Sequence, residues 1–245
     1  MAGSCSLRRD RLFFNTGAIM NRQFLSAITD NIIQIFARDT ISKSSLIARG
    51  RNRQLTREDF IAFLSNMYYL LQHNERTLRD ALSLSEASYP EFAAFYRTKV
   101  KEETDHARWA KDDLRLLGVT EIPESTVIDE CRAIMALNRR QLAESPLMYL
   151  AHVIVLESLT IIVCPALLED SKACGLPPER FTVLSKHVIA DEHHAMENYE
   201  FLDSLNLTEP QQTRFLASIQ ESLLAVHHFL NGVCAYATST IENTL

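Results

Sequence analysis

Apolar side chains recur along most of the chain at every third or fourth residue, the spacing of an amphipathic helix, and Pro and Gly mostly fall between such stretches. The sequence contains no alternating strand pattern bounded by hairpin turns. This punctuation predicts helices over residues 21–38, 56–84, 90–118, 125–142, 146 to beyond 165, 178–205 and 208–237. We therefore expect an all-α, single-domain seven-helix bundle over residues 21–245, preceded by a partly disordered leader over residues 1–20.

Several helix ends carry local signals. Thr56 and Asp59 have the spacing of a capping box at the start of the second helix. Pro90 suits the first turn of the third helix, and Gly118 suits the left-handed position after its end. Pro165 falls inside the apolar fifth helix and is expected to kink or end it.

Composition narrows the classes of function. With 25 Lys and Arg against 31 Asp and Glu, the formal charge is −6, which disfavours broad binding to nucleic acids or anionic membranes. The five cysteines are odd in number and form no CxxC pair, which indicates reduced thiols.

The N-terminal residues lack the apolar core of a signal peptide, so we expect a cytoplasmic protein. Residues 146–168 are long enough to span a bilayer but contain polar side chains and lack basic flanks, so a core helix is expected.

Candidate metal ligands lie on the buried faces of two predicted helices. On helix 178–205, His187, Asp191 and His194 share the stripe that also carries the apolar side chains. On helix 90–118, Glu103 and His106 form an i, i+3 carboxylate–imidazole pair, the arrangement used in di-iron helix bundles. Glu102 lies nearer the edge of that face and is kept as a substitute ligand.

Glu157 is the only acidic residue between positions 149 and 168, and His152 is placed on the opposite face of that helix. A buried, unpaired carboxylate costs several kcal/mol, so it must be protonated, paired or bound to a cation. Arg108 or Arg139 could be the pairing residue. Combined with the imidazoles, however, Glu157 completes a mixed ligand set that favours iron or manganese, and six protein ligands suit two metal ions.

At this point the sequence resembles the heme-oxygenase-like di-iron oxidases and oxygenases. The resemblance is carried by EETDHARWAKDDLRLLG at 102–118, LAHVIVLES at 150–158 and KHVIADEHH at 186–194. It implies two iron ions, O2 as co-substrate, and catalytic roles for the carboxylates of Glu103 and Glu157. The iron ligands that it implies are Glu103, His106, Glu157, His187, Asp191 and His194.

Some members of that family carry a further acidic ligand on the preceding helix, where this chain offers Tyr69. His73 and Glu75 are held as additional candidates. The resemblance also implies a small-molecule substrate, an amino acid or amine derivative being preferred, in natural-product biosynthesis. The implied outcomes are C–C cleavage, desaturation, N-oxygenation or nitrile formation, with an external electron donor and a homodimer both left open. Candidates for a substrate carboxylate clamp are Arg108, Arg132, Arg139 and Arg140.

Other readings remain. Heme cleavage is disfavoured because residues 21–38 contain no histidine to bind heme iron. A metal-free, thiaminase-like aminopyrimidine hydrolase would use Cys131 as its nucleophile. A third alternative is a helical protein without catalytic activity that binds a partner. In that case the polar side chains on the buried helix faces would form a hydrogen-bond network and hold no metal.

Overall fold

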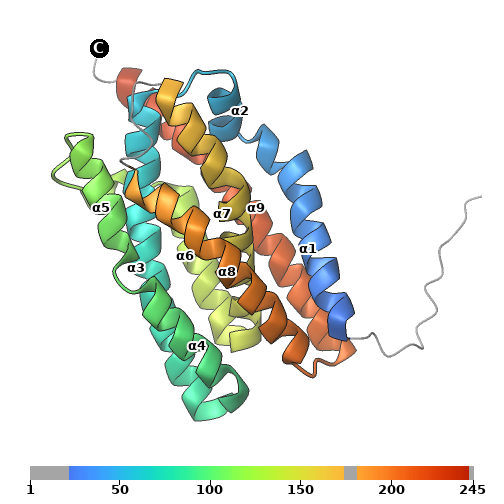
Figure 1. The fold of residues 1–245 in the computed structure, drawn as a ribbon. Coiled ribbons are helices and arrows are strands. Elements are labelled where there is room, and N and C mark those ends of the chain that lie inside the picture. Colours follow the sequence, from blue (N-terminus) through green and yellow to red (C-terminus); the bar gives the residue numbers. More distant parts are fainter. Residues whose placement is uncertain (1–21, 174–180, 243–245) are drawn as a thin grey trace, which may run out of the picture.

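The computed structural model describes residues 22–173 and 181–242, and within these two ranges the chain forms helices and no strand. Figure 1 shows the helices gathered lengthwise into one bundle. Their bounds are α1 Arg22–Asp39, α2 Ser45–Arg51, α3 Arg57–Ser88, α4 Pro90–Glu103, α5 His106–Leu116, α6 Asp129–Glu144, α7 Pro146–Ala173, α8 Thr182–Ser204 and α9 Glu209–Glu242, with short 3-10 turns at Ile41–Lys43 and Glu124–Thr126.

The apolar helix α7 forms the centre of the bundle. It packs against α8, α9, α6 and α2, and α8 crosses in front of it in Figure 1. By length and composition α7 is the one helix of the described part that could cross a membrane, yet 72% of its apolar window is buried inside the protein. The surrounding helices therefore account for its hydrophobicity, as expected for a core helix.

The predicted helix ends are confirmed. The Thr56 side chain accepts a hydrogen bond from the backbone N–H of Asp59, and the Asp59 carboxylate accepts one from the N–H of Thr56, which completes the capping box. Pro90 occupies the first turn of α4. Gly118 has φ of +73° directly after α5, a left-handed conformation that a side chain would strain.

The helices differ from the predicted ones in three places. The predicted helix 90–118 is interrupted at Thr104 and Asp105, where Asp105 adopts a left-handed φ of +69° and separates α4 from α5. Pro165 does not end α7, which continues to Ala173. The short helix α2 was not predicted, because seven residues hold too little periodic pattern to detect. The expected leader lies outside the described residues.

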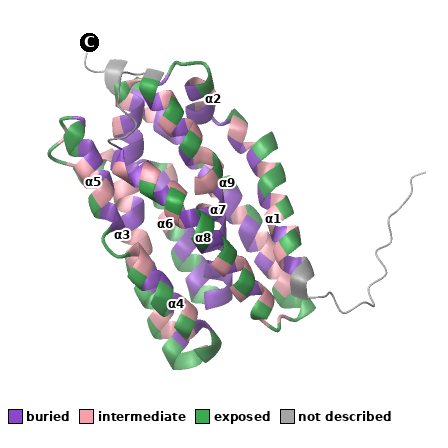
Figure 2. Cartoon of the chain, in the orientation of Figure 1, coloured by how far each residue is buried: buried purple, intermediate pink, exposed green. Residues whose placement is uncertain are grey.

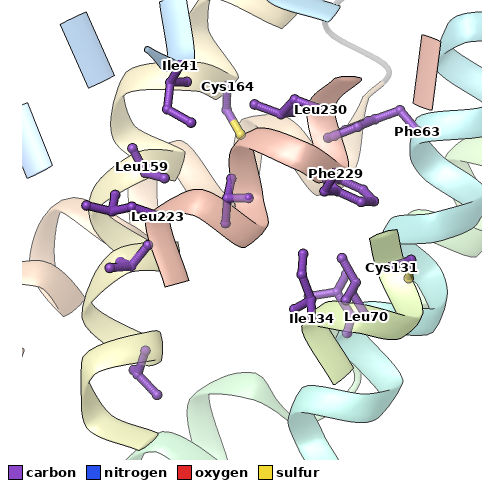
Figure 3. Packing of buried hydrophobic residues seen from close by; sticks show 14 of the residues in the cluster. Ile41, Phe63, Leu70, Cys131, Ile134, Leu159, Cys164, Leu223, Phe229 and Leu230 are labelled. Carbon is purple, nitrogen blue, oxygen red and sulfur yellow. The ribbon is translucent and has the colours of Figure 1, made fainter. Parts of the chain in front are cut away.

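Each outer helix has a buried and an exposed face, as Figure 2 shows by colour. Residues from α3, α6, α7 and α9 meet in the interior shown in Figure 3. There Phe63 and Phe229 pack with ring centroids 6.2 Å apart. Cys164 and Leu230 belong to the same core, and these four residues also line an internal cavity. The fold therefore leaves space beside α7 into which polar groups can point.

Candidate metal centre

The cavity beside α7 has a volume of about 130 Å³ and mostly apolar walls from α3, α6, α7, α8 and α9. Its polar side chains gather mainly on the wall formed by α4, α7 and α8. These are Lys99, Glu103, Glu157, His187 and Asp191. Four of the six predicted metal ligands therefore line this cavity.

The side chains of five predicted ligands form two groups that could each hold a metal ion. Glu103, His106 and His187 form one triad, and Glu103, Glu157 and His194 form the other. Within each triad, the potential ligand atoms lie within 4.8 Å of one another. Because Glu103 belongs to both triads, its carboxylate is placed to bridge two ions.

Asp191 completes the cluster beside the second triad. Its carboxylate oxygen is 3.4 Å from Nδ1 of His194, and the side chain is almost fully buried. The adjacent Asp191 carboxylate is the main reason that the pKa of His194 is raised, although burial opposes it. Glu102, the substitute ligand, lies at the edge of the cluster with its carboxylate 3.6 Å from Nε2 of His194.

The imidazole of His187 is oriented for metal binding. Its Nδ1 lies 2.6 Å from the backbone carbonyl of Val183, which can only accept a hydrogen bond, so Nδ1 carries the proton. Nε2 is then left with its lone pair free for a ligand or metal. Trp109 stacks on His106 with centroids 3.8 Å apart and meets His187 edge-on at 5.4 Å, so one indole packs against both imidazoles.

A buried aspartate on α5 fixes the position of α8. Both carboxylate oxygens of Asp113 accept hydrogen bonds, each 2.8 Å, from the backbone N–H groups of Thr182 and Val183. These are donors at the start of α8 that have no partner within the helix. The helix that carries His106 is thereby attached to the helix that carries His187.

Glu157 has a partner that sequence analysis did not identify. Nζ of Lys99, a side chain only 1% exposed, lies 3.3 Å from the Glu157 carboxylate and 3.0 Å from that of Glu102. The side-chain amide of Asn198 also donates a hydrogen bond to Glu157. The alternative that Glu157 is paired with a basic side chain therefore holds, but the partner is Lys99, since the candidates Arg108 and Arg139 are both exposed.

Burial and charge act against each other at these carboxylates. Burial raises the pKa of Glu157 to about 8, even though the Lys99 ammonium opposes the rise. At Glu103 burial also favours the neutral acid, but hydrogen bonding and charge from His106 outweigh it and leave the pKa lowered. A cation at the second triad would favour ionised Glu157 in the same way that Lys99 does.

The additional candidates on α3 do not join the cluster. His73 lies beside Thr77, with Nε2 3.2 Å from its hydroxyl, and Glu75 forms an ion pair with Arg79 at 2.8 Å. The hydroxyl of Tyr69 donates to the backbone carbonyl of Ile122. None of these three side chains lines the cavity.

The arginines expected to bind a substrate carboxylate lie on the surface, and Arg108, Arg132, Arg139 and Arg140 are all exposed. Cys131 is fully buried against α3, outside the cavity wall, and burial raises the pKa of its thiol to about 12. The cysteine that does line the cavity is Cys164.

His152 was expected on the face of α7 away from Glu157, but it lines the same cavity. A helical wheel places the two residues about 140° apart, which leaves both able to border a wide opening. Lys99 was also missed. It lies on the buried face of α4, where an isolated Lys is the signal that could have revealed it. Asn198 falls on the predicted buried stripe of helix 178–205 beside His187 and Asp191, as the structure confirms, but no role is assigned to it from the sequence.

The donor set fits a redox metal such as iron. It is composed of imidazole and carboxylate groups with no thiolate, which suits iron or manganese. Three buried ligand atoms make no well-formed hydrogen bond and face other candidate ligands instead: Nδ1 of His106 lies 3.0 Å from the Glu103 carboxylate, and Nδ1 of His194 lies 3.4 Å from Oδ1 of Asp191. A cation bound among them would satisfy these atoms.

Comparisons with known proteins bear on the fold. No protein-family model matches the chain, and no curated protein matches it significantly. Among solved structures, it is similar to a heme-oxygenase-like domain of unknown function from Shewanella denitrificans, with 17% identity, a TM-score of 0.76 and coverage of 89% of this chain and 94% of that one. It is also similar to a TenA homologue from Pseudomonas syringae, with 15% identity, a TM-score of 0.69 and coverage of 90% and 98%.

A third similar structure is a CADD-like protein of unknown function from Nostoc punctiforme. It shares 12% identity and a TM-score of 0.71, over 89% of this chain and 99% of that one. At these low identities the similarity shows that the backbones follow the same course. It does not show that the proteins share an activity. The expected all-α bundle is confirmed, and the chain has the heme-oxygenase-like fold.

Proposed function

We propose that this chain is a non-heme di-iron enzyme that uses O2 to oxidise a small molecule. The observation that carries the proposal is the pair of buried triads sharing Glu103, one completed by His106 and His187 and the other by Glu157 and His194. Glu-x-x-His pairs and further carboxylates that project inward from several helices are the ligands of di-iron sites in helical bundles, and Glu103 and His106 form such a pair here.

When bound, two ferrous ions would supply the electrons that activate O2. The residues of the chain would position the reaction. The walls of the cavity are mostly apolar, and the backbone carbonyl of Val183 keeps Nε2 of His187 free as a ligand. Glu103 would hold both ions, while Glu157 would exchange its Lys99 partner for a metal.

The substrate class that we propose is an amino acid or amine derivative, oxidised at a C–H or N–H group, with an external electron donor where the reaction needs one. The cavity supports a compact and largely apolar substrate. Lys99 is the basic side chain on its wall and takes the place of the exposed arginines as a candidate partner for a carboxylate.

The first test is iron binding and O2 uptake. Purified protein is given Fe(II) without oxygen, freed of excess metal, and analysed beside His194→Ala and the matched control His193→Ala, whose side chain is 73% exposed. We expect about two irons per chain in the wild type and the control. In His194→Ala, which loses a second-triad ligand, we expect iron content to fall by half or more and O2 uptake to be lost.

The outcomes separate the alternatives. Binding of one iron per chain, unaffected by His194→Ala, would restrict the metal to the first triad and contradict the di-iron assignment. Equal absence of iron from all three proteins would contradict a metal enzyme and favour the hydrolase or partner-protein readings.

A further inference from the structure

His152 is a buried polar side chain without a partner. It lies on α7 with 1% of its surface exposed, and neither Nδ1 nor Nε2 makes a hydrogen bond. Its ring instead stacks near Tyr149, with centroids 6.3 Å apart. Leaving a buried hydrogen-bonding group unsatisfied costs about 1–3 kcal/mol, so such a group is usually satisfied by water or a ligand.

The position of His152 gives the cavity a second polar border. Glu157 and the other candidate ligands lie along the wall formed by α4, α7 and α8, while His152 and Asn74 lie where α7 faces α3. Val153 and Leu156 lie between the two borders on α7 and are apolar. A molecule in the cavity would therefore contact the metal centre on one side and His152 on the other.

The protonation of His152 defines what it can recognise. Burial lowers its pKa to about 3, so the ring is neutral at pH 7. A neutral imidazole has one nitrogen that donates and one that accepts, and it favours uncharged partners such as hydroxyl or amide groups. The size of the ligand is limited too, since the cavity of about 130 Å³ is close to the roughly 150 Å³ that holds a benzene molecule.

We propose that His152 is the recognition residue of a substrate subsite, and that it hydrogen-bonds an uncharged hydroxyl or amide group on a compact, otherwise apolar molecule about the size of one aromatic ring. This proposal shares one assumption with the proposed function, namely that substrate binds in the cavity. Binding itself requires neither iron nor O2.

The test compares two probes of nearly equal shape, phenol and toluene, with iron-free protein. Dissociation constants are measured by ligand-observed NMR for wild type, His152→Phe and the control His73→Phe, which removes a nearby histidine that does not line the cavity. One hydrogen bond without competing water corresponds to roughly tenfold in affinity. We expect phenol to bind roughly tenfold tighter than toluene in wild type and control, and this preference to vanish or reverse in His152→Phe.

Equal binding of phenol and toluene by the wild type, or an unchanged phenol preference in His152→Phe, would overturn the proposal. The hydrogen-bond partner of His152 would then be a bound water. Should His152→Phe fail to fold, His152→Leu makes the same comparison with a smaller side chain. Iron content is measured on the same variants. Loss of the phenol preference with normal iron loading supports the subsite, whereas normal preference without iron would contradict the proposed function alone.

Discussion

At the scale of single residues, Lys99 places a positive charge beside the carboxylate of Glu157, a member of the second triad. Its ammonium lies within 3.4 Å of both oxygens of Glu157 and 3.0 Å from Glu102, inside a largely apolar cavity. Burial raises the pKa of Glu157 to about 8 and the ammonium opposes that rise, so Lys99 favours the ionised carboxylate in the metal-free site.

This role predicts how Lys99→Met responds to metal. Without metal, we expect the variant to lose about 1–3 kcal/mol of unfolding free energy, because Glu102 loses its ammonium partner and Glu157, whose pKa burial raises to about 8 even beside Lys99, loses a hydrogen-bond donor. A divalent ion at the second triad supplies the missing charge, so Fe(II) or Mn(II) should raise its melting temperature more than that of wild type. Thermal unfolding with and without metal measures both effects.

The matched control is Lys101→Met, which changes an exposed lysine two residues away. It should unfold like wild type within about 0.5 kcal/mol and gain no extra metal stabilisation. An equal metal-induced shift in Lys99→Met and wild type would show that Lys99 does not compensate Glu157.

The same residue shows what sequence could and could not reveal. Glu157 and His187 are identifiable because a polar group within an apolar stripe of one helix is visible from periodicity. The partner of Glu157 lies on another helix, and periodicity does not say which helices meet. Lys99 was therefore missed, and exposed arginines were considered in its place.

At the scale of helices, Asp113 joins α5 to the start of α8 through two buried hydrogen bonds. We expect Asp113→Ala to reduce the free energy of unfolding by about 1–2 kcal/mol, the usual cost of losing an N-terminal helix cap. The neighbouring Asp112→Ala, whose side chain is 44% exposed, should change it by less than about 0.5 kcal/mol. Urea unfolding of both variants gives the comparison, and equal losses would argue against the capping role.

Helix positions were predictable wherever capping or breaking residues mark the ends. Thr56, Pro90 and Gly118 were each assigned correctly because their signals are local. The interruption at Asp105 was not, since Thr and Asp give no strong break signal, although Asp is one of the few residues with a side chain that enters the left-handed region readily. Of the two effects expected at Pro165, a kink or an end, the structure overturns the end, because packing around a central helix can retain a proline that would end an isolated one.

At the scale of the whole molecule, burying a neutral histidine makes stability depend on pH. The folded-state pKa of His152 is about 3, whereas an unfolded histidine titrates near 6.5, so unfolding takes up a proton between these values. Stability contributed by His152 is therefore present above pH 6.5 and falls as the pH drops towards 3. The slope approaches about 1.4 kcal/mol per pH unit.

Urea unfolding at pH 7, 6, 5 and 4 tests this dependence. Wild type should lose stability more steeply below pH 6 than His152→Phe, which has no proton to take up at this position. Parallel curves for the two proteins would mean that the ring is already protonated in the fold, or that solvent reaches it.

The break at Asp105 also has a mechanical consequence. Glu103 is the last residue of α4, so it stands at the pivot between two rods rather than along one of them. His106 is the first residue of α5, so the two members of the first triad that are close in sequence lie on either side of the bend. A substitution at Asp105 that cannot adopt its left-handed backbone would alter the angle between α4 and α5, and Glu103 and His106 would then move relative to each other.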